Sequence, residues 1–319
     1  MADILITSEY FGKFSGKARE TLLLAGHTVT DNPYGHKFLS PEEIIPHIGR
    51  AEALICDLER ISAEVIDAAP RLKAVARRGV GLDSVDLAKC AQRGIAVMRT
   101  PGLVEAPVAE LVLAYILQLS RRIAENDRRM HEGAWEKILG HSVAGKTLGI
   151  LGLGNIGREV AVRAKSFGME LIYCDRSAAT SAEGAERVGF DELLKRSDFL
   201  TLHIPLTSET RNIIDYAQLK QMKPTACVIN TARGGIINEA ALARALGEKV
   251  IAGAAVDVFD VEPNTESPLR NLPGVILTPH IATFTVETFI AMDELCAKNL
   301  IEYFKMEREK DNEQKRVYI

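Results

Sequence analysis

The stretch from Thr147 to Asp175, TLGILGLGNIGREVAVRAKSFGMELIYCD, constrains the fold of this chain more than any other. It begins with a short apolar run and continues with Gly152, Gly154 and Gly157 in the spacing G-x-G-x-x-G. An amphipathic segment follows the glycines, and a second apolar run then ends at Asp175. This order predicts a strand, a tight turn, a helix and a parallel second strand, which is the core of a nucleotide-binding α/β unit.

Each part of this stretch fits a dinucleotide. The first glycine allows the turn, the second lets a pyrophosphate approach the backbone, and the third lets the helix pack on the strand. Asn155 and Ile156 open the helix, where free N–H groups can hold phosphate charge. Asp175 can accept hydrogen bonds from a ribose and would repel a 2′-phosphate, which favours NAD, although the neighbouring Arg176 could neutralise part of that charge and keeps NADP open. Three glycines also occur in ordinary turns. The prediction of a dinucleotide site therefore depends on the order of the whole stretch, in which a strand, a helix and a second strand lead to an acidic residue.

The composition is that of a globular protein large enough for two domains. The chain has 319 residues, 47% hydrophobic and 26% charged, with a net charge of −4, which argues against electrostatic binding of nucleic acid. Its start lacks a basic segment followed by a long apolar one, and the apolar run Leu111–Leu119 is too short to span a membrane, so we expect a cytoplasmic protein without membrane contact. The five cysteines are scattered without C-x-x-C pairs and are expected to be reduced, and no cluster of His, Cys and carboxylates has metal-ligand spacing.

Short apolar strands alternate with helical patterns along most of the chain, which predicts parallel α/β sheets. Thr100-Pro101-Gly102 breaks the chain before a helix expected from Glu105 to about Arg122, and we place a domain boundary there. A last helix is expected from Glu287 to Phe304, followed by a charged tail. The expected strands outside the glycine-rich stretch are Ile4–Thr7, Thr28–Thr30, Ala53–Cys56, Lys73–Ala76, Ala96–Met98, Phe199–Ile204, Ala226–Asn230, Ile251–Val258 and Val275–Leu277.

Polar residues follow the later strands at the end where parallel sheets bind their ligands. Arg233, Glu262 and His280 come after three successive strands. A redox reaction between an alcohol and a carbonyl needs a proton carrier and a group that binds the substrate anion. An imidazole suits proton transfer near neutral pH, a carboxylate can orient it, and an arginine fork can clamp a carboxylate. Singly, each residue has a structural alternative as a surface turn, a helix-start acid or a core histidine; together they predict an active site.

Two further features are less decisive. The loop Arg77–Asp83 leaves a strand end with two glycines and two arginines, so Arg78 is a candidate to face an anion, with solvated arginines on a turn as the alternative. His203 lies shortly before Pro205 without an evident partner, so it is either structural or lines the cofactor.

Seven ordered motifs span nearly the whole chain: RRGVGLDSVDL, TPGLVEAPVAE, LGLGNIGREV, LHIPLTSETRNII, INTARGGIINEAAL, AAVDVFDVEP and TPHIA. With these motifs the chain closely resembles the D-isomer-specific 2-hydroxyacid dehydrogenases. The segments NPYGHKFLSPEEI and AAPRLKAVARRGVG are most similar to phosphoglycerate-dehydrogenase-type members, here expected without a C-terminal regulatory domain.

The resemblance implies two doubly wound parallel-sheet α/β domains. A Rossmann nucleotide-binding domain over residues 101–284 is inserted into a flavodoxin-like substrate domain over residues 1–100 and 285–319. The implied activity is hydride transfer between NAD(H) and a D-2-hydroxy acid or its 2-oxo acid, by a homodimer built on the nucleotide domain.

The resemblance also assigns residues. It carries over Arg233, Glu262 and His280 as the catalytic residues, and it implies that the backbone of Val80 and Gly81 holds the substrate carboxylate. The positions that usually line the nicotinamide end are those of Pro205, Thr231, Ala232, Asp257 and His280.

The identity of the substrate is the most open part of this interpretation. The family commonly has asparagine where this chain has Val104, and Val-Asp-Glu where it has Ile237-Asn238-Glu239. Arg77, Arg78 and Arg99 near the substrate loop suggest a substrate with a second anionic group, such as phosphate, phosphonate or carboxylate. The alternatives are a glyoxylate or hydroxypyruvate reductase that uses NADPH, a non-catalytic NAD(H)-sensing protein of the corepressor type, or a nucleotide-domain methyltransferase, which would leave the three strand-end residues unexplained.

Overall fold

The chain divides into two compact units. The computed structural model describes residues 1–35, 38–177 and 181–317, and side chains up to residue 310. Unit 1 contains Met1–Val104 and Phe284–Ile319, and unit 2 contains Glu105–Thr283. The sequence had indicated boundaries after residues 100 and 284.

Unit 1 has a parallel five-stranded sheet in the order β2-β1-β3-β4-β5, the flavodoxin-like order. Alternate residues of its strands enter two different cores, so that Leu54 and Val75 face one core while Ile55 and Ala76 face the other. Both faces are therefore buried, as expected for a parallel sheet covered by helices. The strands are β1 (Asp3–Ile6), β2 (Thr28–Thr30), β3 (Ala53–Cys56), β4 (Ala74–Arg77) and β5 (Ala96–Met98).

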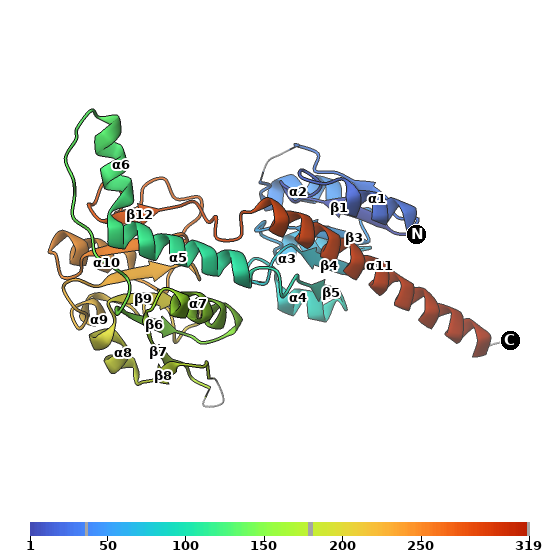
Figure 1. Ribbon diagram of the computed structural model, residues 1–319. Helices are drawn as coiled ribbons and strands as arrows, with labels where there is room; N and C mark the ends of the chain where they lie inside the picture. The colour runs from blue at the N-terminus through green and yellow to red at the C-terminus, as the bar shows by residue number, and fades with distance from the viewer. Residues whose placement is uncertain (36–37, 178–180, 318–319) are drawn as a thin grey trace. The chain divides into compact units, whose positions relative to one another are not determined.

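Helices cover both faces of this sheet (Figure 1). The last helix is longer than the sequence suggested, because its apolar face ends near Phe304 while the helix continues to Val317 through Glu, Lys, Arg and Gln, which are good helix formers. The helices of unit 1 are α1 (Lys17–Leu24), α2 (Pro41–Ile48), α3 (Ala63–Asp67), α4 (Leu87–Gln92) and α11 (Val286–Val317).

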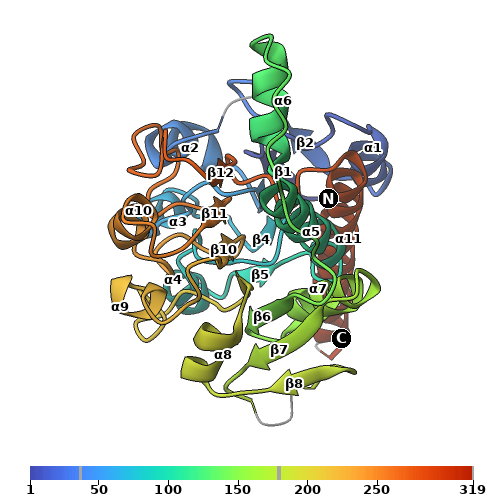
Figure 2. The ribbon, with the colours of Figure 1, turned by 60° about the vertical axis from the view of Figure 1, so that its left-hand side comes forward.

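Unit 2 has a parallel seven-stranded sheet in the order β12-β11-β10-β9-β6-β7-β8 (Figure 2). With β6 counted as the first strand, this is the Rossmann order 3-2-1-4-5-6 extended by one strand. The two sheet orders confirm the predicted fold class. The strands are β6 (Thr147–Leu151), β7 (Glu170–Cys174), β8 (Ala185–Arg187), β9 (Phe199–Leu202), β10 (Cys227–Asn230), β11 (Gly253–Val256) and β12 (Val275–Leu277).

Two helices that bear on the site pack together on one face of this sheet. These are α5 and α7, whose buried residues share a core with Ile150 and Ala255 of the strands. A left-handed residue, Arg122 (φ 52°), separates α5 from α6, so the predicted helix ends one residue early and a second one follows. The helices of unit 2 are α5 (Glu105–Arg121), α6 (Ile123–His131), α7 (Asn155–Ser166), α8 (Phe190–Arg196), α9 (Tyr216–Leu219) and α10 (Glu239–Gly247).

Three general features bear on the class of protein. Among the described residues, no helix is long and apolar enough to cross a membrane, and no group of His, Cys, Asp and Glu side chains is arranged to hold a metal ion. The five cysteines form no disulfide, and four of them are buried.

Candidate active site

The glycine-rich turn joins β6 to α7 with very little space around two of its glycines. Gly152 has a φ of 92°, and a Cβ there would lie 2.7 Å from the backbone oxygen of His203. A Cβ on Gly157 would lie 2.3 Å from the oxygen of Gly152. Nothing lies within 4 Å of a Cβ built on Gly154, at the start of α7. The turn is therefore closed against the sheet and open at the helix N-terminus, which fits the pyrophosphate of a dinucleotide.

Asp175 lies directly after β7, beside the turn. Its carboxylate accepts hydrogen bonds from the backbone of Leu153 and of Ser177, both at 2.8 Å. The acidic group is thus fixed where the ribose of a dinucleotide is expected, while Arg176 is exposed.

His203 follows β9 and is held by its own strand. Its Nε2 lies 2.9 Å from Oγ1 of the buried Thr201, and its backbone N donates to Leu151. Burial of the ring lowers the pKa of His203 to about 3, so it is neutral at physiological pH. His203 therefore supports the wall of the turn, and Pro205 beyond it is exposed.

The loop after β10 presents Arg233. Asn230, the buried last residue of the strand, accepts from the N of Ala232 at 3.1 Å and donates to the oxygen of Arg233 at 2.9 Å. Between them, Thr231 is 7% exposed, and its Oγ1 has no hydrogen-bond partner among the described residues. A buried hydroxyl of this kind is suited to a polar group of the cofactor, such as the carboxamide of a nicotinamide.

The Arg233 loop lies against the loop that carries Glu262. A Cβ on Gly234 would lie 1.9 Å from the backbone oxygen of Phe259, so the two loops touch at a position that only glycine permits. Glu262 accepts from the N of Phe259 at 2.8 Å. Burial would raise the pKa of Glu262, but the hydrogen bond and charge of His280, together with the charge of Arg233, bring it below its ordinary value.

His280 and Glu262 form the central pair of the site. His280 Nδ1 lies 2.7 Å from Glu262 Oε2, and the two side chains are 28% and 30% exposed. An ionised carboxylate can only accept, so His280 Nδ1 donates and Nε2 becomes the nitrogen that can exchange a proton with a ligand. The structure thus brings the three predicted catalytic residues together on neighbouring strand ends of unit 2.

Asp257, one residue past β11, lies beneath the His280 loop. It is fully buried, and its carboxylate accepts from Thr278 Oγ1 and from the backbone N of Ile281 and Ala282. These bonds fix the loop that carries His280, and the predicted contact of Asp257 with the nicotinamide stays a prediction.

Arg78 was expected to face a substrate anion, but the structure gives it partners inside the protein. Its side chain is 0% exposed and forms ion pairs with Asp57 (2.5 Å) and Asp293 (2.6 Å), all within unit 1. It also lies over the ring of Phe289, 4.9 Å from the centroid. Two acidic side chains that are distant in sequence therefore neutralise this buried arginine.

A profile of the family described as D-isomer specific 2-hydroxyacid dehydrogenase, NAD binding domain, matches residues 113–282. The chain belongs to this family. The matched segment lies inside unit 2 and confirms the predicted cofactor, NAD.

Individual known proteins are similar to this chain over most of its length. A glyoxylate reductase of Thermococcus litoralis is 44% identical over 261 residues, which cover 78% of this chain and 79% of the relative. The crystal structure of a protein from Thermus thermophilus is 37% identical with a TM-score of 0.87, covering 94% of this chain and 96% of that one. D-lactate dehydrogenase from Aquifex aeolicus, solved with NAD and lactic acid, is 27% identical with a TM-score of 0.83, covering 96% of both chains.

The two departures from the family pattern have structural counterparts. Val104 is 3% exposed at the end of the first segment of unit 1. Asn238 caps α10 by accepting from the N of Ala241, as an aspartate would, and Glu239 accepts from the N of Asp260 at 2.9 Å. The second departure thus preserves the cap and the link to the Glu262 loop.

Sequence reasoning missed Asn230, Thr278 and Tyr115. All three lie in or beside apolar runs, where a polar group needs a partner when it is buried. A polar residue within or beside an apolar run is therefore the sequence signal that could have identified these three residues.

Proposed function

We propose that this dehydrogenase interconverts a small 2-oxo acid and its D-2-hydroxy acid with NAD(H). The observation that carries the proposal is the His280–Glu262 pair at 2.7 Å, beside Arg233 and on the same sheet as the glycine turn. When bound, the nicotinamide supplies or accepts the hydride.

The protein residues handle the proton and the substrate charge. In the reduction, His280 Nε2 donates a proton to the carbonyl oxygen as the carbonyl carbon receives the hydride, and the ring then regains a proton from water. Glu262 holds Nδ1 and stabilises the charged imidazole. Arg233 binds the carboxylate with its planar guanidinium and polarises the adjacent carbonyl. The family resemblance adds the backbone of Val80 and Gly81 as further contacts to the carboxylate.

NADH is the proposed form of the cofactor. The support is Asp175, whose carboxylate is fixed at the turn by Leu153 and Ser177 and would repel a 2′-phosphate. The neighbouring Arg176 is exposed, so water and salt screen much of its charge.

Glyoxylate is the first substrate to test, since several similar proteins are named glyoxylate reductase. A substrate with a second anionic group loses its main support, because Arg78 is neutralised by two carboxylates and Arg77 is 8% exposed; only Arg99 of the three is exposed. The phosphoglycerate-type assignment has no separate support.

The test is nicotinamide turnover with matched substrates. NADH and NADPH would each be mixed with glyoxylate, hydroxypyruvate, pyruvate and a phosphorylated 2-oxo acid, and kcat/KM compared. We expect NADH with a small monoanionic acid to give the highest value. Higher kcat/KM with the phosphorylated acid would contradict the substrate class, and binding of NADH without turnover of any acid would favour a non-catalytic NAD(H)-sensing protein.

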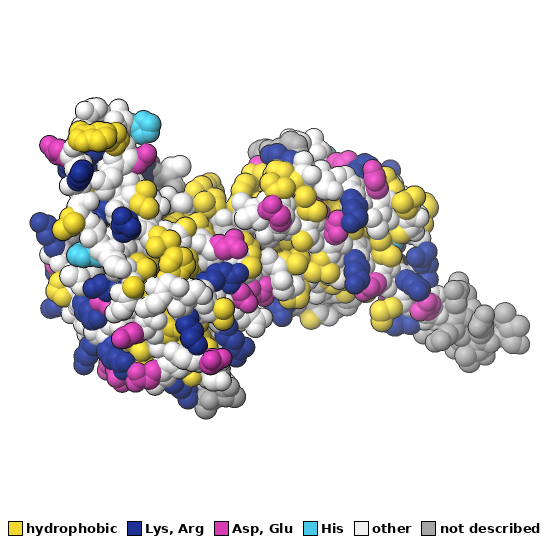
Figure 3. Space-filling view, in the orientation of Figure 1, with side chains coloured by type: hydrophobic (Ala, Val, Ile, Leu, Met, Phe, Trp, Pro, Cys, Tyr) yellow, Lys and Arg dark blue, Asp and Glu magenta, His cyan; other side chains and the backbone are white. Residues whose placement is uncertain are grey.

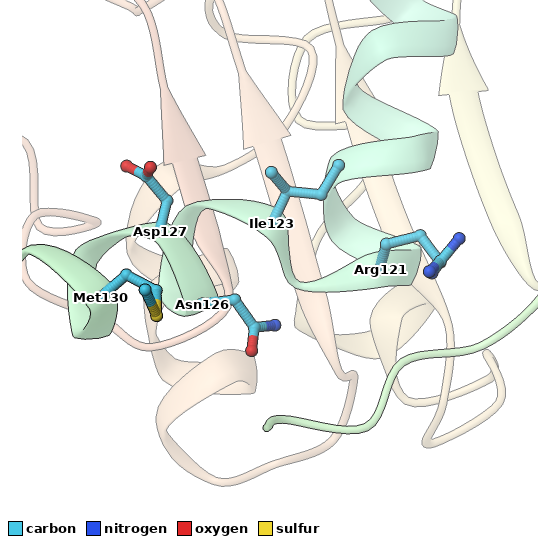
Figure 4. A pocket seen from close by; sticks show the side chains of 5 residues that line it. All are labelled: Arg121, Ile123, Asn126, Asp127 and Met130. Atoms are coloured by element: carbon cyan, nitrogen blue, oxygen red, sulfur yellow. The ribbon is translucent and has the colours of Figure 1, made fainter. Parts of the chain in front are cut away.

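We also propose a homodimer built on unit 2. The support is the arm at residues 123–139, which follows α5 and exposes four large apolar side chains: Ile123 and Met130 are each 52% exposed, Trp135 80% and Leu139 88%. Figure 3 shows hydrophobic side chains among charged ones over α6. A hollow of about 340 Å³ on this arm is lined by Arg121, Ile123, Asn126, Asp127 and Met130 and is separate from the catalytic residues (Figure 4). Light scattering should give the mass of a dimer, and Trp135→Asp with Leu139→Asp should give that of a monomer; a monomeric wild type would exclude the proposal.

A further inference from the structure

A phenol is buried in the apolar face of α5. Tyr115 is 2% exposed and belongs to the same core as Val112, Ile116 and Ala255. A hydroxyl in such surroundings costs free energy unless it is hydrogen-bonded. The Tyr115 hydroxyl is bonded to Thr278 Oγ1, just past β12. Burial raises the pKa of Tyr115, so the phenol keeps its proton.

The direction of the hydrogen bonds can be deduced from their ends. Thr278 Oγ1 lies 2.5 Å from Asp257 Oδ1, and a carboxylate can only accept, so the single hydroxyl proton of Thr278 is used in that bond. Tyr115 must therefore donate to Thr278. The bonds run from Tyr115 through Thr278 to Asp257, three residues brought together from α5 and from two strand ends of unit 2.

Asp257 in turn holds the turn that carries His280. Its carboxylate accepts from Ile281 N at 2.8 Å and Ala282 N at 2.9 Å, and its backbone oxygen accepts from His280 N at 2.8 Å. His280 has a φ of 55°, in the left-handed region that is unfavourable for a residue with a Cβ. The bonds to Asp257 therefore oppose the relaxation of this turn, which would move the imidazole.

We propose that Tyr115 is a positioning residue that acts through Thr278 and Asp257 to hold the left-handed turn of His280. The proposal rests on the proposed role of His280 as the proton carrier. Tyr115 fixes the hydroxyl rotor of Thr278 toward Asp257, which keeps one carboxylate oxygen in place for Ile281 N. Because small displacements of a catalytic group have large effects on rate, the result should appear in kcat and not in cofactor binding.

The experiment compares hydroxyl deletions within the chain of bonds and outside it. Tyr115→Phe and Thr278→Val each remove one hydroxyl, and the double variant removes both. Thr278→Ser keeps the hydroxyl. The matched control is Tyr173→Phe, because Tyr173 is 4% exposed in the same core. Steady-state kcat and the dissociation constant of NADH are measured for each, and wild type and His280→Ala are assayed first.

We expect Tyr115→Phe to lower kcat about fivefold to tenfold, with the NADH dissociation constant within about twofold of wild type. The double variant should be no slower than Thr278→Val, because both changes interrupt the same chain of bonds. Wild-type kcat for Tyr115→Phe, multiplicative effects in the double variant, or an equal loss in Tyr173→Phe would each overturn the proposal.

Two results keep the test decisive. If Tyr115→Phe does not fold, the comparison of Thr278→Ser with Thr278→Val decides. A near wild-type kcat for Thr278→Ser and a low kcat for Thr278→Val support the proposal, and equal kcat values for these two variants overturn it. If the wild type turns over none of the 2-oxo acids, the proposed function fails first, which is distinct from an active wild type with an unaffected Tyr115→Phe.

Discussion

Replacing Glu262 with glutamine removes one negative charge next to His280 and keeps the side-chain length. The two groups are joined at 2.7 Å and are 30% and 28% exposed. Two unit charges about 4 Å apart attract by about 1 kcal/mol in water and about 4 kcal/mol near a protein surface, and a hydrogen bond to a charged group contributes about 1.5–3 kcal/mol. Because the pair is partly exposed, we take about 1.5–3 kcal/mol as the loss, which corresponds to about 10- to 150-fold in rate.

The assay is oxidation of the 2-hydroxy acid by NAD, since the imidazole gains its charge in that direction. Glu262→Gln should lower kcat by about 10- to 150-fold with little change in NAD binding. Asp260→Asn is the matched control, because Asp260 lies in the same loop but pairs with Arg211 at the surface, 3.0 Å away, where an ion pair contributes little. A Glu262→Gln kcat within about threefold of wild type, or an equal loss in Asp260→Asn, would refute this account of the pair.

Three further predictions concern the framework. Arg78→Met should lower the free energy of unfolding by about 3–5 kcal/mol in urea titrations, because it leaves Asp57 and the 2%-exposed Asp293 without their ion-pair partner. A loss below about 1 kcal/mol would show that the two ion pairs of Arg78 add little to stability. Gly157→Ala should weaken NADH binding at least about tenfold, since the added Cβ meets the Gly152 oxygen at 2.3 Å. Gly189→Ala, which has open space at its Cβ, should bind NADH normally. Equal NADH affinities for the two variants would contradict the role of the close turn. The ring nitrogens of the buried His27 have no hydrogen-bond partner among the described residues, and burial lowers the pKa of the ring below its ordinary 6.5. The unfolded chain therefore takes up the proton first, and urea midpoints should fall as pH drops below about 6.5. His27→Leu should lose part of this fall, and an identical pH profile would exclude His27 as a cause.

The glycine-rich stretch was readable from the sequence because its structure is local. The second apolar run of the stretch is β7, which ends directly before Asp175, and α7 begins directly after Gly154. Turn, helix and strand there depend on residues a few positions apart, so periodicity and glycine spacing suffice. The strand ends that carry Arg233, Glu262 and His280 were placed by the same alternation, together with the rule that parallel strands end at one edge.

Arg78 shows where such reasoning stops. The sequence places an arginine in a glycine-rich loop, but its partners Asp57 and Asp293 are 21 and 215 positions away, and nothing local indicates that they converge on it. Tyr115 is similar, because helical periodicity assigns it to the core while its hydroxyl partner, Thr278, is 163 positions away. Polar groups inside a core are decided by tertiary contacts, which apolar patterns do not encode.

In the proposed reaction, His280 moves the substrate proton while the rest of unit 2 holds the nucleotide. The most direct measurement is kcat for the 2-oxo acid and the dissociation constant of NADH in His280→Ala, compared with wild type. We expect kcat to fall by about 10²- to 10⁴-fold, as for loss of a general acid, while NADH binds within about threefold of wild type. A kcat within about tenfold of wild type would contradict the role of His280 as the proton carrier.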